Sequence, residues 1–84
     1  MTAKVLLLND NKTTMEFVVQ VLENIFEKTR EEALKMVLEI HRDGSGVCGV
    51  YEPERAWKVA EQVTELARRS RYPLRCVVDP DVAT

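Results

Sequence analysis

The chain alternates between short runs of consecutive apolar residues and longer segments in which apolar residues recur every three or four positions. Short apolar runs bounded by polar or glycine-rich loops are typical of buried strands, and the wider spacing is typical of amphipathic helices. The predicted strands cover residues 4–8, 47–51 and 74–78. The order β-α-α-β-α-β predicts an α/β fold, a two-layer sandwich in which three helices pack on a three-stranded antiparallel sheet.

Two pairs of residues mark the expected starts of the first two helices. Thr13 with Glu16, and Thr29 with Glu32, have the spacing of a capping box. In this motif the threonine hydroxyl and the glutamate carboxylate each accept a hydrogen bond from a backbone N–H group that the helix leaves unpaired. We therefore expect one helix to begin at each pair, with a short link between the two helices.

Glycine and proline place the remaining boundaries. Residues 42–46 are glycine-rich and end the second helix, and Pro53 suits the first turn of the third helix. The predicted buried face of the first helix comprises Met15, Val18, Val19, Leu22, Ile25 and Phe26. That of the second helix comprises Ala33, Leu34, Val37, Leu38, Ile40 and His41. That of the third helix comprises Ala56, Val59, Ala60, Val63, Leu66 and Ala67.

Length and composition indicate a single globular domain. The 84 residues are 45% hydrophobic and 31% charged, and we assign residues 4–80 to this domain and 81–84 to a frayed tail. A net charge of -2 argues against a nucleic-acid partner, which would require a basic excess. The longest apolar stretch, residues 5–8, is too short to cross a membrane, and no secretory leader precedes it. We expect a cytoplasmic protein and, because coiled-coil heptads are absent, a monomer.

The sequence gives little support to catalysis or metal binding. His41 is the only histidine, and no motif such as GxSxG accompanies it. Cys48 and Cys76 lack the spacing of metal ligands; a disulfide stays open, but we expect two reduced thiols packed in the core. Residues 44–46 lack the Lys-Ser/Thr of a phosphate-binding loop. We therefore expect no enzyme, no cofactor and no metal.

Two further features have ordinary explanations. A basic patch near the end of the third helix consists of Arg68, Arg69, Arg71 and Arg75. We interpret it as cations favoured by the negative end of the helix, ahead of an anion or partner site. Trp57 is expected to cover the edge of the core, with a role at an interface as the alternative.

One set of residues suggests a binding site. The polar segment 9–11 directly follows the first strand, and His41 lies one helical turn after Val37, with Ile40 beside them. If the loop and this helix face meet, hydrogen-bond acceptors lie beside an apolar hollow, which suits a cation attached to a hydrophobic side chain. Spacing alone favours a plainer interpretation, a turn and a core histidine with its hydrogen bonds satisfied.

Four blocks of sequence, in this order and spacing, resemble the ClpS family. They are Leu8-Asn9-Asp10, then Thr13-x-Met15-Glu16-Phe17-Val18, then His41 followed by Gly44 and Val47-Cys48-Gly49-Val50-Tyr51, then Pro73-Leu74-x-Cys76. The similarity runs from about Lys4 to Val77, which is nearly the whole chain.

The resemblance implies an adaptor that recognises N-degrons, proteins whose first residue is Leu, Phe, Tyr or Trp, and delivers them to a ClpA-type AAA+ unfoldase. It implies that the α-amino group and first peptide unit of the ligand are held by Asn9, Asp10, Asn11 and His41. It implies a side-chain pocket lined by Thr13, Met15, Val18, Val37, Ile40 and Leu74. Glu54 falls at a position for docking on the unfoldase, and residues 1–3 would be what remains of the N-terminal extension of the family.

Two other classes of protein compete with this interpretation. The pattern of elements also resembles the C-terminal domain of ribosomal protein L7/L12, an interaction module that would lack the pocket. A cavity bounded by Asn9, His41 and Leu74 would discriminate between the two. A small hydrolase would need a nucleophile positioned beside His41, and the sequence offers none.

Overall fold

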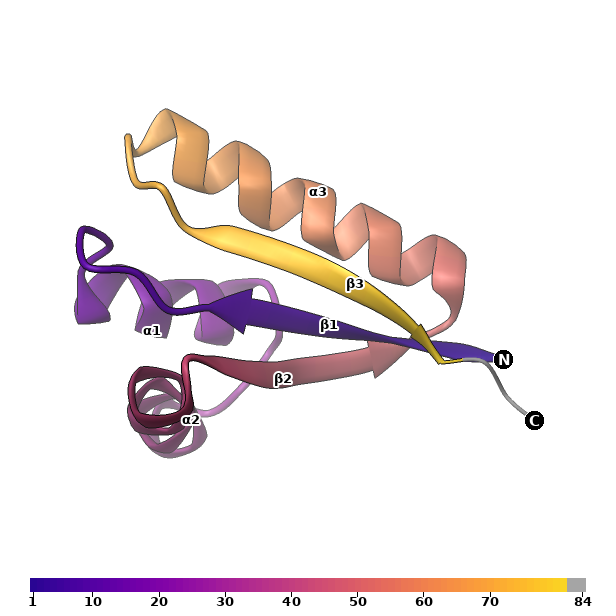
Figure 1. The fold of residues 1–84 in the computed structure, drawn as a ribbon, viewed down its shortest axis with the longest axis horizontal. Helices are drawn as coiled ribbons and strands as arrows, with labels where there is room; N and C mark the ends of the chain where they lie inside the picture. Colours follow the sequence, from indigo (N-terminus) through magenta and orange to yellow (C-terminus); the bar gives the residue numbers. More distant parts are fainter. Residues whose placement is uncertain (82–84) are drawn as a thin grey trace.

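The computed structural model describes residues 1–81, in which an antiparallel sheet packs against three helices (Figure 1). The elements are β1 (Thr2–Leu8), α1 (Met15–Asn24), α2 (Arg30–Asp43), β2 (Ser45–Tyr51), α3 (Pro53–Arg69) and β3 (Arg75–Asp81). The predicted fold class and element order are confirmed.

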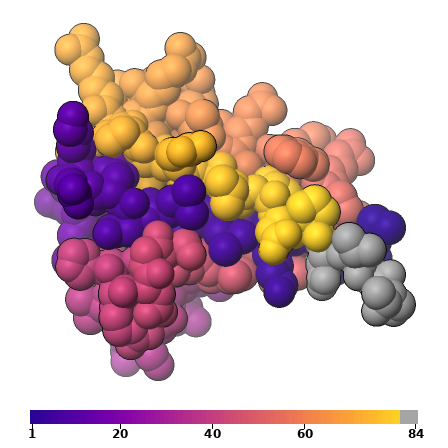
Figure 2. All heavy atoms as spheres, in the orientation of Figure 1, coloured from indigo at the N-terminus to yellow at the C-terminus, as the bar shows by residue number. Residues whose placement is uncertain are grey.

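The first strand lies at the centre of the sheet, whose order is β2-β1-β3 with both neighbours antiparallel to β1. Ala3, Val5 and Leu7 are fully buried, as the period of two along a strand requires when one face packs on helices. The other face is open: atoms of β1 and β3 form part of the surface in Figure 2. The sheet therefore packs on the core through one face and borders solvent on the other.

The buried face of α1 differs from the prediction. Phe17 and Val21 are buried together with Val19 and Leu22, whereas Met15 is 51% exposed. Apolar residues span more than half of the circumference of this short helix, so spacing alone does not decide which of them face the core. The orientation of α1 is set by tertiary packing, in which the ring centroids of Phe17 and Tyr72 lie 4.6 Å apart.

The other two helices follow their predicted patterns more closely. In α2, Ala33, Val37 and Ile40 are buried as expected, but Leu34 and Leu38 are 43% and 60% exposed, and His41 is exposed as well. In α3 every predicted core position is buried except Leu66, which is half-buried. The buried stripe of α2 is thus narrower than its apolar residues suggested.

Helix caps explain where the helices begin and end. Thr29 and Glu32 form the predicted capping box, and Gly44 ends α2 in the left-handed region with φ of 88°. The capping box predicted at Thr13 is wrong. Thr14 caps α1 instead, its hydroxyl accepting a hydrogen bond from the Phe17 N–H, because the Thr13 hydroxyl donates to Asp10.

Both ends of the chain extend further into the sheet than expected. Thr2 pairs with Asp81 and Ala3 with Pro80, so β1 includes two residues that the sequence-based prediction assigns to an N-terminal extension. The same pairing puts Asp81 in a strand, not in the predicted frayed tail. The rest of that tail, residues 82–84, lies outside the described residues.

The two thiols are free, as predicted. Burial raises the pKa of Cys48 to about 11 and that of Cys76 to about 12. The two residues lie on β2 and β3, which flank β1, so their backbones are about 10 Å apart, beyond the roughly 7 Å that a disulfide allows.

Three sequence-based expectations concern the surface. Trp57 is 58% exposed, so it covers little of the core, contrary to prediction. No helix within residues 1–81 is both long enough and apolar enough to cross a membrane. The same residues contain no cluster of three His, Cys, Asp or Glu side chains able to hold a metal ion.

Candidate functional site

A hollow of about 300 Å³ lies where the end of β1, the loop after it, the first turn of α1 and the last turns of α2 meet. It is lined by Asn9, Asp10, Asn11, Thr13, Met15, Val18, Val37, Ile40 and His41. All nine residues belong to the site that the sequence predicted. The structure therefore brings together residues up to 32 positions apart in the chain, since the hollow runs from Asn9 to His41.

A backbone hydrogen bond holds the two sides of the hollow together. The Asn9 N–H donates to the carbonyl of Gly44, the residue that caps α2, at 2.9 Å. This bond fixes the start of the loop beside the helix end that carries His41. Because Gly44 requires a positive φ, the sequence signal that ends α2 also positions the loop.

Asp10 organises the loop from within. Its Oδ1 accepts hydrogen bonds from the backbone N–H groups of Lys12 and Thr13, at 2.8 and 2.7 Å, and its Oδ2 accepts one from the Thr13 hydroxyl at 2.7 Å. Burial raises the pKa of this carboxyl, but the hydrogen bonds from Thr13 and Lys12 outweigh burial and hold the pKa below its usual value. Three of the roughly four acceptor positions of a carboxylate are thus used inside the loop.

The remaining polar side chains of the hollow have no partner among residues 1–81. No described residue forms a hydrogen bond with the side chains of Asn9, Asn11 or His41. Asn9, Asn11 and His41 are all exposed. The plainer interpretation, in which His41 is a core histidine with its bonds satisfied, is therefore wrong.

The apolar side of the hollow belongs to the core. Val37 and Ile40 are 5% and 4% exposed, and Val18 is half-buried. Met15, the first residue of α1, is half exposed and still lines the hollow. Buried apolar side chains and exposed amide and imidazole side chains thus line one hollow, which is the combination that a cation attached to a hydrophobic group requires.

Two predicted residues lie elsewhere. Leu74 is buried in the core, 6% exposed, and does not line this hollow. Of the three residues expected to bound the discriminating cavity, Asn9 and His41 line the hollow and Leu74 does not. Leu74 precedes β3, and packing there draws its side chain inward. Glu54 lies in the first turn of α3, away from the hollow, with its carboxylate 3.9 Å from the Lys58 ammonium.

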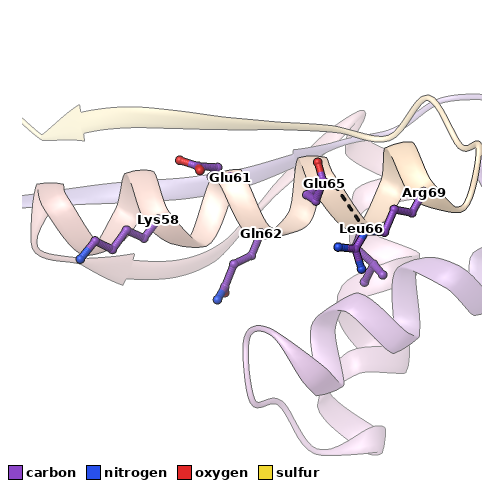
Figure 3. Close-up of a pocket in the computed structure, with 6 residues that line it drawn as sticks. All are labelled: Lys58, Glu61, Gln62, Glu65, Leu66 and Arg69. Carbon is purple, nitrogen blue, oxygen red and sulfur yellow. Dashed lines mark hydrogen bonds and ion pairs between the residues drawn. The ribbon is translucent and has the colours of Figure 1, made fainter.

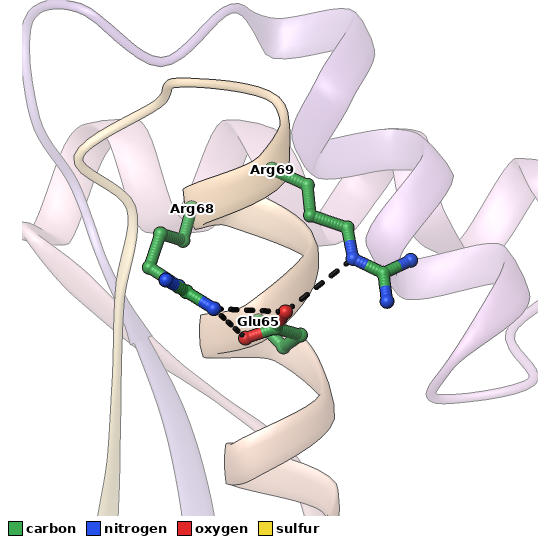
Figure 4. Close-up of polar contacts among 3 residues, drawn as sticks. All are labelled: Glu65, Arg68 and Arg69. Atoms are coloured by element: carbon green, nitrogen blue, oxygen red, sulfur yellow. Dashed lines mark hydrogen bonds and ion pairs between the residues drawn. The ribbon is translucent and has the colours of Figure 1, made fainter.

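A larger hollow of about 450 Å³ runs along α3 (Figure 3). All of its lining residues come from this one helix: Lys58, Glu61, Gln62, Glu65, Leu66 and Arg69. The Glu65 carboxylate accepts hydrogen bonds from Arg68 at 2.7 Å and from Arg69 at 3.4 Å (Figure 4). Of the four arginines in the basic patch, Arg68 and Arg69 lie in the last turn of α3, whereas Arg71 follows the helix and Arg75 begins β3.

Sequence reasoning missed one part of the site, the bonding of Asp10 to Thr13. The signal was present as an aspartate followed three residues later by a threonine, which allows a carboxylate to accept bonds from nearby backbone N–H groups. We instead expected Thr13 to pair with Glu16, because Thr13 is the threonine with a glutamate three residues later.

Comparisons with known proteins agree on one family. The sequence model described as "ATP-dependent Clp protease adaptor protein ClpS" matches residues 1–77. Clp protease adapter proteins ClpS from Gluconobacter oxydans and Phenylobacterium zucineum are 50% and 51% identical over 78 residues, 93% of this chain. The chain spans 66% and 72% of the length of these two relatives.

A solved structure, Agrobacterium tumefaciens ClpS2 bound to L-phenylalaninamide, is similar with a TM-score of 0.92 and 34% sequence identity. The match covers 95% of this chain and 96% of that one. The family model covers nearly the whole chain, and about half of the aligned residues are identical in the two relatives. The chain belongs to the ClpS family of Clp protease adaptor proteins.

Proposed function

We propose that this chain is a non-enzymatic adaptor that binds the free α-amino group and the large hydrophobic first residue of N-degron proteins. The preferred first residues are Leu, Phe, Tyr and Trp. The adaptor delivers these proteins to a ClpA-type AAA+ unfoldase in the cytoplasm. The observation that carries the proposal is the hollow itself, where unpaired acceptors on one side face buried apolar residues on the other.

The α-amino group supplies the polar half of the recognition. A protonated amine has three donors, and Asn9 Oδ1, Asn11 Oδ1 and a neutral His41 nitrogen are acceptors that line the hollow. Each hydrogen bond to a charged group contributes about 1.5–3 kcal/mol. The Asp10 carboxylate adds negative charge beside them, although most of its acceptor positions already serve the loop.

The first side chain supplies the apolar half. Burying a phenylalanine side chain contributes about 2–3 kcal/mol, and Val37, Ile40 and Val18 provide the apolar contacts. A volume of about 300 Å³ is at the lower end of ligand pockets, which suits one residue better than a longer segment. After the costs of association, micromolar or somewhat tighter binding is expected.

The solved relative supports this ligand chemistry. L-phenylalaninamide, bound by Agrobacterium tumefaciens ClpS2, combines a free α-amino group, an aromatic side chain and one amide. These are the three groups that the present hollow is equipped to contact.

Delivery rests on a separate surface. Glu54 and Lys58 lie on the first turns of α3, with side chains 87% and 73% exposed, where a partner can reach them without covering the hollow. A fluorescent protein with an N-terminal Phe should be degraded by a ClpA-type unfoldase and its peptidase only when the adaptor is added. The variant E54A should slow this degradation while leaving peptide affinity unchanged, and a loss of peptide affinity in E54A would contradict this separation.

Binding is tested by fluorescence anisotropy with peptides that differ only at their first residue. Phe- and Leu-initiated peptides should bind, while a Gly-initiated peptide should bind at least tenfold more weakly because it fills none of the apolar side. If Gly- and Phe-initiated peptides bind equally, the hollow is not a side-chain pocket and the proposed function is wrong.

A further inference from the structure

We propose that Leu34 and Leu38 form an apolar ridge on α2 that contacts the ligand residues following the first one. The site would then prefer N-degrons with apolar residues just after the first residue. This inference rests on the proposed function and extends it from the first residue to the next few.

The ridge consists of two large apolar side chains in solvent. Leu38 and Leu34 are 60% and 43% exposed, whereas Leu7 and Leu22 in the core are fully buried. Residues four apart on a helix stack over each other, so these two form one continuous strip. Leaving both in water is unfavourable unless another surface covers them.

The ridge continues from the wall of the hollow. Each residue of a helix is rotated by about 100° from the one before it. Leu34 is seven positions before His41 and so lies about 20° from it around the helix axis, and Leu38, three positions before His41, lies about 60° from it. Val37 and Ile40 lie on the opposite side of His41, toward the core. His41 therefore stands between the apolar wall of the hollow and the ridge.

The distances suit an extended peptide. Along the axis, Leu38 lies about 4.5 Å and Leu34 about 10.5 Å from His41, at 1.5 Å per residue. An extended chain advances about 3.3 Å per residue. If the α-amino group is held at His41, the second or third residue reaches Leu38 and the fourth or fifth reaches Leu34.

Charge gives this surface little selectivity of its own. Lys35 and Glu39, each one residue after a leucine of the ridge, carry opposite charges and lie one helical turn apart. The Arg42 guanidinium lies 2.9 Å from the Asp43 carboxylate, with which it forms an ion pair. Apolar contact is therefore the property that the ridge offers. His41 lines the hollow, so a substrate chain that leaves the hollow past His41 meets the ridge next, and the substrate is the occupant that this continuity favours.

The test uses two peptides that share an N-terminal Phe and differ at positions two to four, one with alanine and one with leucine there. The wild-type chain should bind the leucine peptide about three- to tenfold more tightly. In the double variant L34S/L38S this advantage should fall below twofold, while the affinity for the alanine peptide stays unchanged. The control K35S, on the same helix, should keep the full advantage.

Each result distinguishes this inference from the function on which it rests. If the alanine peptide binds but leucine gives no advantage, or if the advantage survives in L34S/L38S, the ridge does not contact the ligand. If neither peptide binds, the proposed function fails and the ridge fails with it. Both leucines are exposed, so the variant should stay folded and lose only a few degrees of unfolding temperature, about what two serines in a helix cost.

Discussion

The hollow at the end of β1 and the hollow along α3 both combine polar and apolar side chains, but they differ in how those side chains are held. The α3 hollow is larger, about 450 Å³ against about 300 Å³, but all of its lining residues come from one exposed helix. There the Glu65 carboxylate already accepts hydrogen bonds from Arg68 and Arg69. The smaller hollow is lined by residues of three segments, the loop after β1, α1 and α2, and Asn9, Asn11 and His41 keep their acceptors available.

This difference indicates what makes a hollow a recognition site. Surface ion pairs in high dielectric contribute little and can exchange partners, so the α3 hollow has no fixed polar geometry. The smaller hollow has a wall buried in the core and a loop held by the Asp10 carboxylate. Preorganisation, not volume, is the property that distinguishes the two.

Among variants of the chain, the largest expected effect comes from removing the imidazole of His41. H41A should weaken the binding of a Phe-initiated peptide about ten- to a hundredfold, because one hydrogen bond to a charged amine is lost. The matched control R69A, in the α3 hollow, should leave affinity within twofold. Equal losses in the two variants, measured by anisotropy, would erase the distinction between the hollows.

The second effect concerns the loop. D10A removes all three hydrogen bonds that Asp10 accepts and should weaken peptide binding about tenfold, because the loop that carries Asn9 and Asn11 loses its order. D10N keeps an oxygen acceptor and should recover most of the affinity. Should D10N bind as poorly as D10A, the carboxylate would act on the ligand through its charge and not on the loop.

A smaller effect should follow from narrowing the apolar wall. V37M adds length at a position that is 5% exposed, which should reduce the affinity for Trp-initiated peptides several-fold more than that for Leu-initiated peptides. The ratio of the two affinities is the readout, and thermal unfolding of V37M checks that the core remains intact. An unchanged ratio would place the first side chain away from Val37.

The smallest effect is a dependence of stability on pH. The pKa of Asp10 is lower in the folded chain than its usual value, so its stabilising contribution is complete above the unfolded-state pKa of about 3.9 and is lost as pH falls through the folded-state value. T13V removes the hydroxyl donor and part of this shift. The difference in unfolding temperature between wild type and T13V should be greatest at neutral pH and shrink below pH 4, and a constant difference would contradict this role.

The sequence predicted the residues of the hollow and most helix boundaries better than it predicted which apolar side chains are buried. The Gly44 cap, the capping box at Thr29 and all nine residues of the hollow could be predicted from spacing and from the family resemblance. Leu74 turns into the core, and Met15 is half exposed, because neighbouring elements decide which side of a short apolar segment is covered. The Thr13–Asp10 bond was missed because Thr13 also has the capping-box spacing to Glu16.

The central claim is that the hollow reads a free α-amino group together with a hydrophobic side chain. The most direct test compares one Phe-initiated peptide with the same peptide acetylated at its N-terminus, by anisotropy with the wild-type chain. Acetylation removes the charge and leaves acceptors without donors, so affinity should fall at least a hundredfold. Equal binding of the two peptides would contradict the account, because the acceptors of Asn9, Asn11 and His41 would then have no role in recognition.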